Sequence, residues 1–289
     1  MKSTIDCIYC YLRQAVNCMK HAEVPMDEQP EILYSLMDMI KKLDTNETPC
    51  YNSTFTIRKT YELSNCQDPF KAEKIDSNIK AKALLENLEG TFDYNDLHKL
   101  FVLSSAGNII DTGIMFEYDI EKTMIETLES GFSVDHYELF SKKLQNAKTI
   151  LYLGDNCGEI VFDAPVVEFL SGIGKDVYYA VKSAPILNDA LTEDALFAGI
   201  DKYAEIIETG SGFLGVNPNN SSPEFMDLLN NADLVISKGQ ANFESLDEYP
   251  GADGRIFFIL KIKCDGIAVR IPESVYGDSV FYTTGGQSV

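Results

Sequence analysis

Long hydrophobic runs are absent from this 289-residue sequence. No stretch approaches the roughly 18 uninterrupted apolar residues that are needed to cross a bilayer. The first ten residues, from Met1 to Cys10, contain no apolar core of the kind found in signal peptides. We therefore expect a cytoplasmic protein that is not associated with a membrane.

Basic residues are also in short supply. The sequence has 24 Lys and Arg against 45 Asp and Glu, which gives a formal net charge of −21. Such a surface repels nucleic acids and anionic membranes, so neither is an expected partner. If the substrate is an anion, the site must supply local positive charge, and a bound metal ion could provide it.

Histidine is scarce, because the chain has only His21, His98 and His136, and this argues against a His-rich zinc site. The seven cysteines are an odd number in a chain too large to need disulfide bonds, so we expect reduced thiols. The pair Cys7-x-x-Cys10 could contribute to a structural metal site. The same spacing also suits a buried helix face.

The pattern of apolar and polar residues changes near residue 146. Residues 1–145 show helical spacing around 33–40, 81–88, 120–128 and 134–144, with turn residues at 46–53 and 64–70. From residue 149 onward, short apolar segments alternate with helical ones. We predict a mainly helical region over 1–145 and a Rossmann-like α/β domain over 146–289.

The predicted α/β domain has a parallel sheet of about five strands. The expected strands are 149–153, 177–181, 205–208, 234–237 and 256–261, with helices at 159–170, 192–198, 223–230 and 243–246 between them. Right-handed crossovers place every strand-to-helix junction at one edge of such a sheet. Ligands of open α/β sheets bind at that edge.

The first of these junctions is Leu151-Tyr-Leu-Gly-Asp-Asn-Cys-Gly-Glu-Ile160. An apolar strand ends there in adjacent oxygen ligands, Asp155 and Asn156, and Glu159 follows in the first helical turn. The helix N-terminus adds backbone donors for an anion. Asp155 or Asn156 could instead simply cap the helix.

Polar residues also follow the next three strands. Asn188 and Asp189 come after the second, the loop Thr209-Gly-Ser-Gly212 after the third, and Lys238 after the fourth. Each has an alternative interpretation as an ordinary cap or turn. Their coincidence at one edge favours a site there. Within the helical half, Asn108 could approach this site, or Ala106-Gly-Asn-Ile-Ile-Asp111 could be an ordinary turn.

Several separated motifs resemble those of the DUF89 family, also called damage-control phosphatases. In the second half they are Gly154-Asp-Asn-Cys-Gly-Glu-Ile-Val-Phe-Asp163, Pro185-Ile-Leu-Asn-Asp189, Lys238-Gly-Gln-Ala-Asn-Phe-Glu-Ser245 and Lys261-Ile-Lys-Cys264. The first half resembles the cysteine-containing prokaryotic branch of this family in Cys7-x-x-Cys10, Gln14, Asp68-Pro-Phe70 and Gly107-Asn-Ile-Ile-Asp111. The resemblance covers essentially the whole chain in order.

The resemblance implies a helical region followed by a Rossmann-like domain, and a metal-dependent phosphatase acting on small phosphorylated metabolites such as sugar phosphates or damaged phosphate esters. By motif, the metal ligands would be Asp155, Asn156 and Asp189, and Lys238 would hold the phosphate. Two positions depart from the family pattern. Cys157 stands where Ala is frequent, and Ala241 replaces a Gly that could set how closely its loop approaches the substrate.

Two carboxylates and an amide oxygen form a hard ligand set, which suits Mg²⁺ or Mn²⁺; Co²⁺ and Ni²⁺ are further candidates. A metal-activated water would attack the phosphoryl group, with Asp155 the most sensitive ligand. Glu159 could accept the proton, or could merely stabilise the helix N-terminus. Ser211 and Gly212 could donate backbone N–H groups to the phosphate, and Asn108 could also bind the substrate.

Two other functions fit the same sequence. An S-adenosylmethionine-dependent carboxyl methyltransferase would also use a Rossmann-like sheet, although it expects a glycine-rich loop without the acidic and amide groups of Gly154–Gly158. A non-catalytic sensor of phosphorylated metabolites would use the same ligands for binding alone. The sequence does not indicate an oligomeric state or a particular substrate.

Overall fold

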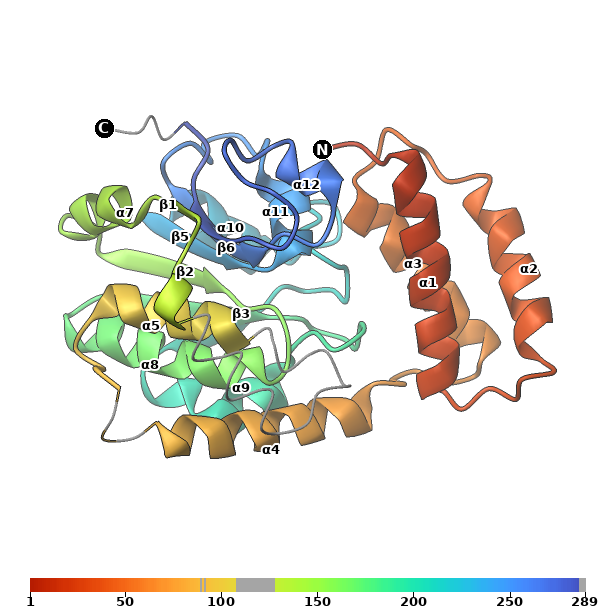
Figure 1. The fold of residues 1–289 in the computed structure, drawn as a ribbon, viewed down its shortest axis with the longest axis horizontal. Helices are drawn as coiled ribbons and strands as arrows, with labels where there is room; N and C mark the ends of the chain where they lie inside the picture. Colours follow the sequence, from red (N-terminus) through yellow and green to blue (C-terminus); the bar gives the residue numbers. More distant parts are fainter. Residues whose placement is uncertain (89, 91, 108–127, 286–289) are drawn as a thin grey trace.

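A single mostly parallel sheet organises the molecule (Figure 1). The computed structural model describes residues 1–88, 90, 92–107 and 128–285. In these residues the sheet has seven strands in the order β1-β7-β6-β5-β2-β3-β4. The strands are β1 (Val134–Asp135), β2 (Thr149–Leu153), β3 (Asp176–Val181), β4 (Glu205–Glu208), β5 (Leu234–Lys238), β6 (Ile256–Lys261) and β7 (Ser279–Tyr282).

The five expected strands are all present and run parallel to one another. Two short strands extend the sheet beyond them, because β7 pairs antiparallel with β6 and β1 pairs with β7. The expectation of a helix from residue 134 is wrong at its start, since Val134–Asp135 is β1 and α7 begins at Tyr137. Pairing with β7, a distant segment, overrides the local helical pattern there.

Helices cover both faces of the sheet. One face packs against α4 (Lys71–Asn87), α5 (Leu97–Ala106), α7 (Tyr137–Leu144), α8 (Glu159–Gly172) and α9 (Thr192–Ala198). The other packs against α10 (Pro223–Asn231), α11 (Gln240–Leu246) and α12 (Asp265–Ala268). Neighbouring residues of β2 divide between the two cores: Ile150 and Tyr152 lie in the first, Leu151 and Leu153 in the second. This is why the central strands are apolar throughout.

The N-terminal helices α1 (Ile5–His21), α2 (Gln29–Ile40) and α3 (Pro49–Leu63) form a separate layer at one end of the sheet (Figure 1). A third apolar cluster joins Tyr61 of α3 to Ile186 and Leu214, which lie in the loops after β3 and β4. These helices therefore stand beside the carboxyl edge. Turn structure was expected over 46–53, but α3 already begins at Pro49, because Thr48 caps it by accepting the N–H of Tyr51.

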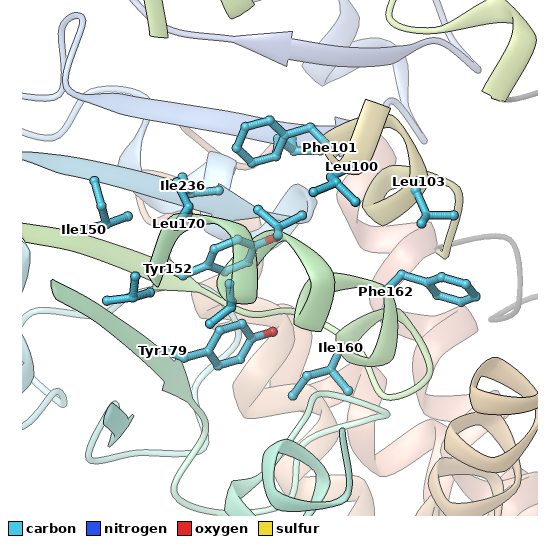
Figure 2. Close-up of a cluster of buried hydrophobic side chains, with 14 of the residues drawn as sticks. Leu100, Phe101, Leu103, Ile150, Tyr152, Ile160, Phe162, Leu170, Tyr179 and Ile236 are labelled. Carbon is cyan, nitrogen blue, oxygen red and sulfur yellow. The ribbon is translucent and has the colours of Figure 1, made fainter. Parts of the chain in front are cut away.

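The core does not stop at the predicted boundary between residues 145 and 146. Leu100 and Phe101 of α5 belong to the same cluster as Ile150 and Tyr152 of β2, and Figure 2 shows them beside the sheet. α4 and α5 thus complete the sheet domain, whereas α1 to α3 contribute to its carboxyl edge. In the described part of the chain, no helix is long and apolar enough to cross a membrane.

Candidate functional site

The carboxyl ends of β2 and β5 lie side by side at the point where the order of strand addition reverses. The chain runs from β2 to β3 and β4 on one side, then returns to β5 and β6 on the other. In open α/β sheets such a switch point is the usual ligand site. Asp155 follows β2, and Lys238 ends β5. The residues expected to bind ligand are therefore placed at this edge by the strand order.

The three predicted metal ligands are brought together by main-chain bonds. Asn156 and Asp189 form an isolated antiparallel bridge. The N–H of Ala190 donates to the Asp155 carbonyl at 2.8 Å, and the N–H of Cys157 donates to the Asn188 carbonyl at 2.9 Å. The loops after β2 and β3 are thus paired along their length, which places two carboxylates and one side-chain amide side by side.

The electrostatics of this group suit a cation. Burial raises the pKa of Asp155 well above its ordinary value, and the negative charges of Asp189 and Glu159 raise it further, while Lys263 and Lys182 act against them. Asn156 Nδ2 donates to Asp155 Oδ2 at 3.0 Å, an arrangement that leaves the amide oxygen of Asn156 as an acceptor. Adjacent buried carboxylates repel each other, and a hard divalent ion would compensate them.

The donor set therefore fits Mg²⁺ or Mn²⁺ through oxygen atoms alone. Within the described ranges there is no group of three or more His, Cys, Asp or Glu side chains positioned to hold a metal ion. A site built from Asp155, Asn156 and Asp189 depends on the amide of Asn156 as its third protein ligand, and a small cation would complete its shell with water and substrate oxygens.

Glu159 lies in the first turn of α8, as expected, and it is paired with Lys238. The distance from Lys238 Nζ to Glu159 Oε1 is 2.6 Å, and that to Asp163 Oδ1 is 2.9 Å. The Lys238 side chain has no exposed surface. This differs from the expectation that Lys238 faces the phosphate, because two carboxylates enclose its ammonium group beneath the edge of the sheet.

The loop after β4 contains Ser211 and Gly212 and lies against the loop after β3. Gly210 N–H donates to Ser183 Oγ at 2.7 Å, and Ser183 N–H donates to the Ser211 carbonyl at 3.1 Å. A Cβ atom on Gly212 would lie 2.8 Å from the Ala184 carbonyl oxygen, so this close approach requires glycine. That these amides bind an anion stays a prediction. Asn108 lies outside the described residues.

Gly239 is a residue of this site that sequence reasoning missed. Its φ of +81° and ψ of 163° belong to a region that is essentially limited to glycine. A Cβ atom at this position would lie 2.0 Å from Asp155 Oδ2. Gly239 therefore leaves the space that the Asp155 carboxylate occupies. The signal in the sequence was a glycine directly after a buried strand, but many turns share it.

Two side chains from the helical half hold the ligand loops in place. Asn78 of α4 accepts the Gly158 N–H at 2.7 Å and donates to Asp194 Oδ1 at 2.7 Å. Tyr61 of α3 accepts the Leu187 N–H at 2.8 Å. Because both contacts join distant segments, no local pattern marked these residues. They fix the turn before α8 and the loop that carries Asp189.

Lys263 is an exposed lysine at this edge of the sheet. It follows β6, and its positive charge lowers the pKa of both Asp155 and Glu159, which places it within electrostatic range of the site. Its N–H donates to Gln240 Oε1 at 3.1 Å, which joins the loop after β6 to the start of α11. Of the lysines around the site, its exposure makes Lys263 the best placed to meet a phosphate from solvent.

All seven cysteines are unpaired in the structure. Cys10 is exposed and Cys7 is half-buried, so the pair does not form a buried helix face. Although part of Cys10 is exposed, its sulfur lies among protein atoms, and this desolvation raises the pKa of the thiol to about 11; the charge of Glu244 adds to the rise, followed by Cys7 and Cys264. The C-x-x-C pair therefore lies near the chain segment that follows β6.

Glu244 is a buried carboxyl group close to Cys264 in the segment after β6, and its raised pKa can be tested by the pH dependence of stability. Burial raises its pKa from 4.5 to about 7. A raised pKa stabilises the fold below pH 4.5, and this contribution is lost as the pH rises through about 7. Replacing Glu244 with Gln removes the titration, so Glu244→Gln should gain stability relative to wild type between pH 5 and pH 8, by up to about 3 kcal/mol.

Urea unfolding of wild type and Glu244→Gln at both pH values measures this difference. The comparison reports the titration of Glu244 together with its coupling to the N-terminus and Asp247, whose charges act on it. A stability difference that does not change with pH would contradict the raised pKa.

The fold defines an α/β protein with a Rossmann-like sheet, and oxygen-bearing side chains gather at the switch point of its strand order. The chain belongs to a known family of this kind: residues 3–277 match the family model described as the damage-control phosphatase ARMT1-like domain. The match spans both the helical half and the sheet.

Relatives of similar length support this assignment. An uncharacterized protein of Methanocaldococcus jannaschii is 36% identical over 284 residues, which cover 95% of this chain and 93% of the relative. A damage-control phosphatase of Pyrococcus horikoshii is 32% identical over 278 residues, covering 94% and 96% of the two chains. The crystal structure of a DUF89 family protein from P. horikoshii superposes with a TM-score of 0.91 at 31% identity, covering 98% of this chain and 99% of the other.

Proposed function

We propose that this protein is a phosphatase that hydrolyses phosphate esters of small metabolites with the help of a divalent metal ion. The observation that carries the proposal is the juxtaposition of Asp155, Asn156 and Asp189 at the switch point, where the Asn156–Asp189 bridge pairs two ligand loops. Two of the curated relatives are named damage-control phosphatases, which supports this reaction class.

In this proposal, Asp155, Asn156 and Asp189 hold Mn²⁺ or Mg²⁺. The ion, when bound, supplies Lewis-acid charge to the phosphoryl oxygens and lowers the pKa of water. Without such charge, the acidic site would repel a phosphate ester, because the whole chain carries a net charge of −21.

The side chains around the ligands have separate roles. Glu159 accepts the proton of the attacking water, since its carboxylate is fixed at the start of α8 beside the ligand loop. Lys263 contacts the phosphate from the solvent side and orients it. The backbone N–H groups of the Ser211–Gly212 segment stay candidate phosphate donors.

The proposed substrates are small phosphate esters, including sugar phosphates and damaged phosphometabolites. The loops after β3 and β4 pack against α3 through Ile186, Leu214 and Tyr61, so the helical layer limits the room above the edge of the sheet. A large polymeric substrate would have to displace this layer. Nucleic acid is further disfavoured by the acidic surface.

Phosphate release from a panel of small phosphate esters tests the proposal. The metal-free protein should be inactive, and addition of Mn²⁺, Mg²⁺, Co²⁺ or Ni²⁺ should restore turnover, with Mn²⁺ and Mg²⁺ preferred because all the proposed ligands are hard oxygen atoms. Binding of phosphosugars without phosphate release would indicate a sensor. Tight, metal-independent binding of S-adenosylmethionine would indicate a methyltransferase instead.

A further inference from the structure

Lys238 is the most completely buried cation near the site, and all its donors are occupied. Nζ donates to Ser104 Oγ at 2.6 Å and to the Ser104 carbonyl at 3.2 Å, and it forms the ion pairs with Glu159 and Asp163 at 2.6 and 2.9 Å. A lysine ammonium has three N–H donors. Four acceptors already share them, so a phosphate could reach Nζ only by breaking one of these contacts.

Asp163 forms a rigid base for this lysine. Its Oδ1 accepts from Ser104 Oγ at 2.6 Å and from Tyr152 OH at 2.7 Å, and its Oδ2 accepts from Tyr179 OH at 2.7 Å. The two tyrosine rings stack with centroids 5.0 Å apart, and Figure 2 shows their hydroxyl groups pointing the same way. With Lys238, four donors from α5, β2, β3 and β5 fix this carboxylate.

Glu159 and Asp163 are four residues apart on α8, so their side chains project from the same face of the helix. Lys238 bridges them from β5, the strand next to β2. The ammonium group thus connects a carboxylate held by four donors to a second carboxylate beside the ligand loop. Two carboxylates and one ammonium therefore form one buried group at the start of α8.

We propose that Lys238 is a positioning residue, which holds the Glu159 carboxylate in place beside Asp155 and does not contact the phosphate of the substrate. This inference rests on the proposed function. In it, the Glu159 carboxylate is held by Lys238, and Lys238 is held by Asp163 and Ser104. Removal of the ammonium lets the Glu159 side chain turn away from the position where it accepts a proton.

A double-mutant cycle of wild type, Glu159→Gln, Lys238→Met and the combined variant tests this role. The readouts are kcat and KM for p-nitrophenyl phosphate, the inhibition constant of inorganic phosphate, and Mn²⁺ binding by calorimetry without substrate. Each single variant should lower kcat about 100-fold, the range of one general base. The double variant should be no slower than Glu159→Gln, because both changes remove the same function.

Inorganic phosphate distinguishes a positioning role of Lys238 from direct binding of the phosphate. We expect its inhibition constant and KM to change less than about threefold across the cycle, since phosphate does not touch Lys238. All four proteins should bind Mn²⁺. Losses in kcat that multiply, together with a tenfold weaker phosphate constant in both Lys238 variants, would overturn the proposal and assign Lys238 to the phosphate.

Lys238→Met leaves two buried carboxylates without their cation and could fail to fold. In that case the comparison of Glu159→Gln with Glu159→Gln/Lys238→Met decides. The double variant buries one carboxylate fewer than Lys238→Met does. Equal KM and phosphate constants in this pair support the positioning role, and a tenfold difference opposes it.

Lys74→Met is the matched control for losing a buried ammonium. Lys74 is also buried and pairs with Asp68 at 3.1 Å, but it lies on α4. We expect its kcat to stay within about threefold of wild type, because it does not contact Glu159. A loss as large as that of Lys238→Met would refute a specific role for Lys238. Absence of metal-dependent turnover in the wild type would instead reject the proposed function, whereas direct binding of inorganic phosphate to the same proteins, measured by calorimetry, would still test Lys238.

Discussion

Replacing Asp155 with Ala is expected to abolish metal-dependent phosphate release, with a loss in kcat of at least about 1,000-fold. Asp155 supplies one of the two carboxylates of the proposed cation site, and its main chain also carries the bond to Ala190 that pairs the ligand loops. The alanine variant keeps that main-chain bond. The fold should therefore stay intact while the cation loses its strongest ligand.

Stability measurements distinguish this loss from misfolding. Burial, Asp189 and Glu159 raise the pKa of Asp155, so the metal-free wild type should lose stability as the pH rises. Metal-free Asp155→Ala should be at least as stable as wild type at pH 8, because it removes this repulsion. Mn²⁺ should raise the melting temperature of the wild type but not of the variant.

Asp176→Ala is the matched control for Asp155→Ala. Asp176 is an exposed aspartate that begins β3 at the opposite edge of the sheet and pairs with Lys148 at 3.4 Å. It should keep full turnover and the Mn²⁺ response. Retention of wild-type turnover by Asp155→Ala with metal present would remove Asp155 from the proposed site.

Gly239→Ala is expected to reduce both stability and turnover, although it adds only one methyl group. The Cβ atom would lie 2.0 Å from Asp155 Oδ2, so either the Asp155 carboxylate or the loop after β5 must move. The backbone at Gly239, with a φ of +81°, is also unfavourable for alanine. We expect turnover to fall at least about 100-fold, because misplacement of a reacting group by roughly 1 Å has this effect.

Gly174→Ala tests the effect of a positive φ without a steric clash. Gly174 has the same φ of +81°, but a Cβ atom there meets nothing within 4 Å. This control should lose only the strain energy of roughly 1–2 kcal/mol and keep its turnover. Urea unfolding, kcat and Mn²⁺ calorimetry on the two variants measure the comparison. Equal behaviour of both would show that Gly239 matters for its backbone angle alone.

Much of the sheet was predictable because its signals are local. Apolar segments of four to six residues, each followed by a helical pattern, located β2 to β6 to within one residue at either end. The same local reading placed Asp155, Asn156 and Asp189 at strand ends. Parallel connections place these ends at one edge, and the family resemblance then selected the proposed ligand set from the polar residues there.

The errors occurred where contacts between distant segments decide the structure. Val134–Asp135 has a helical pattern but pairs with β7, which is more than a hundred residues away. The helical half also shares the core of the sheet, since α5 belongs to the same apolar cluster as β2 and its apolar face needs the sheet to cover it. In both cases a distant partner outweighs the local preference.

For this protein, the sequence by itself determined the class of fold, the family resemblance and the candidate oxygen ligands, because these depend on local periodicity and on short motifs. Only the tertiary structure decided what surrounds the ligands. It placed Lys238 beneath the edge with Asp163 and Glu159, and it brought Gly239 against Asp155. The physical reason is that burial and van der Waals contact arise between segments far apart in the chain. The sequence of one segment alone does not show which distant segment will pack against it.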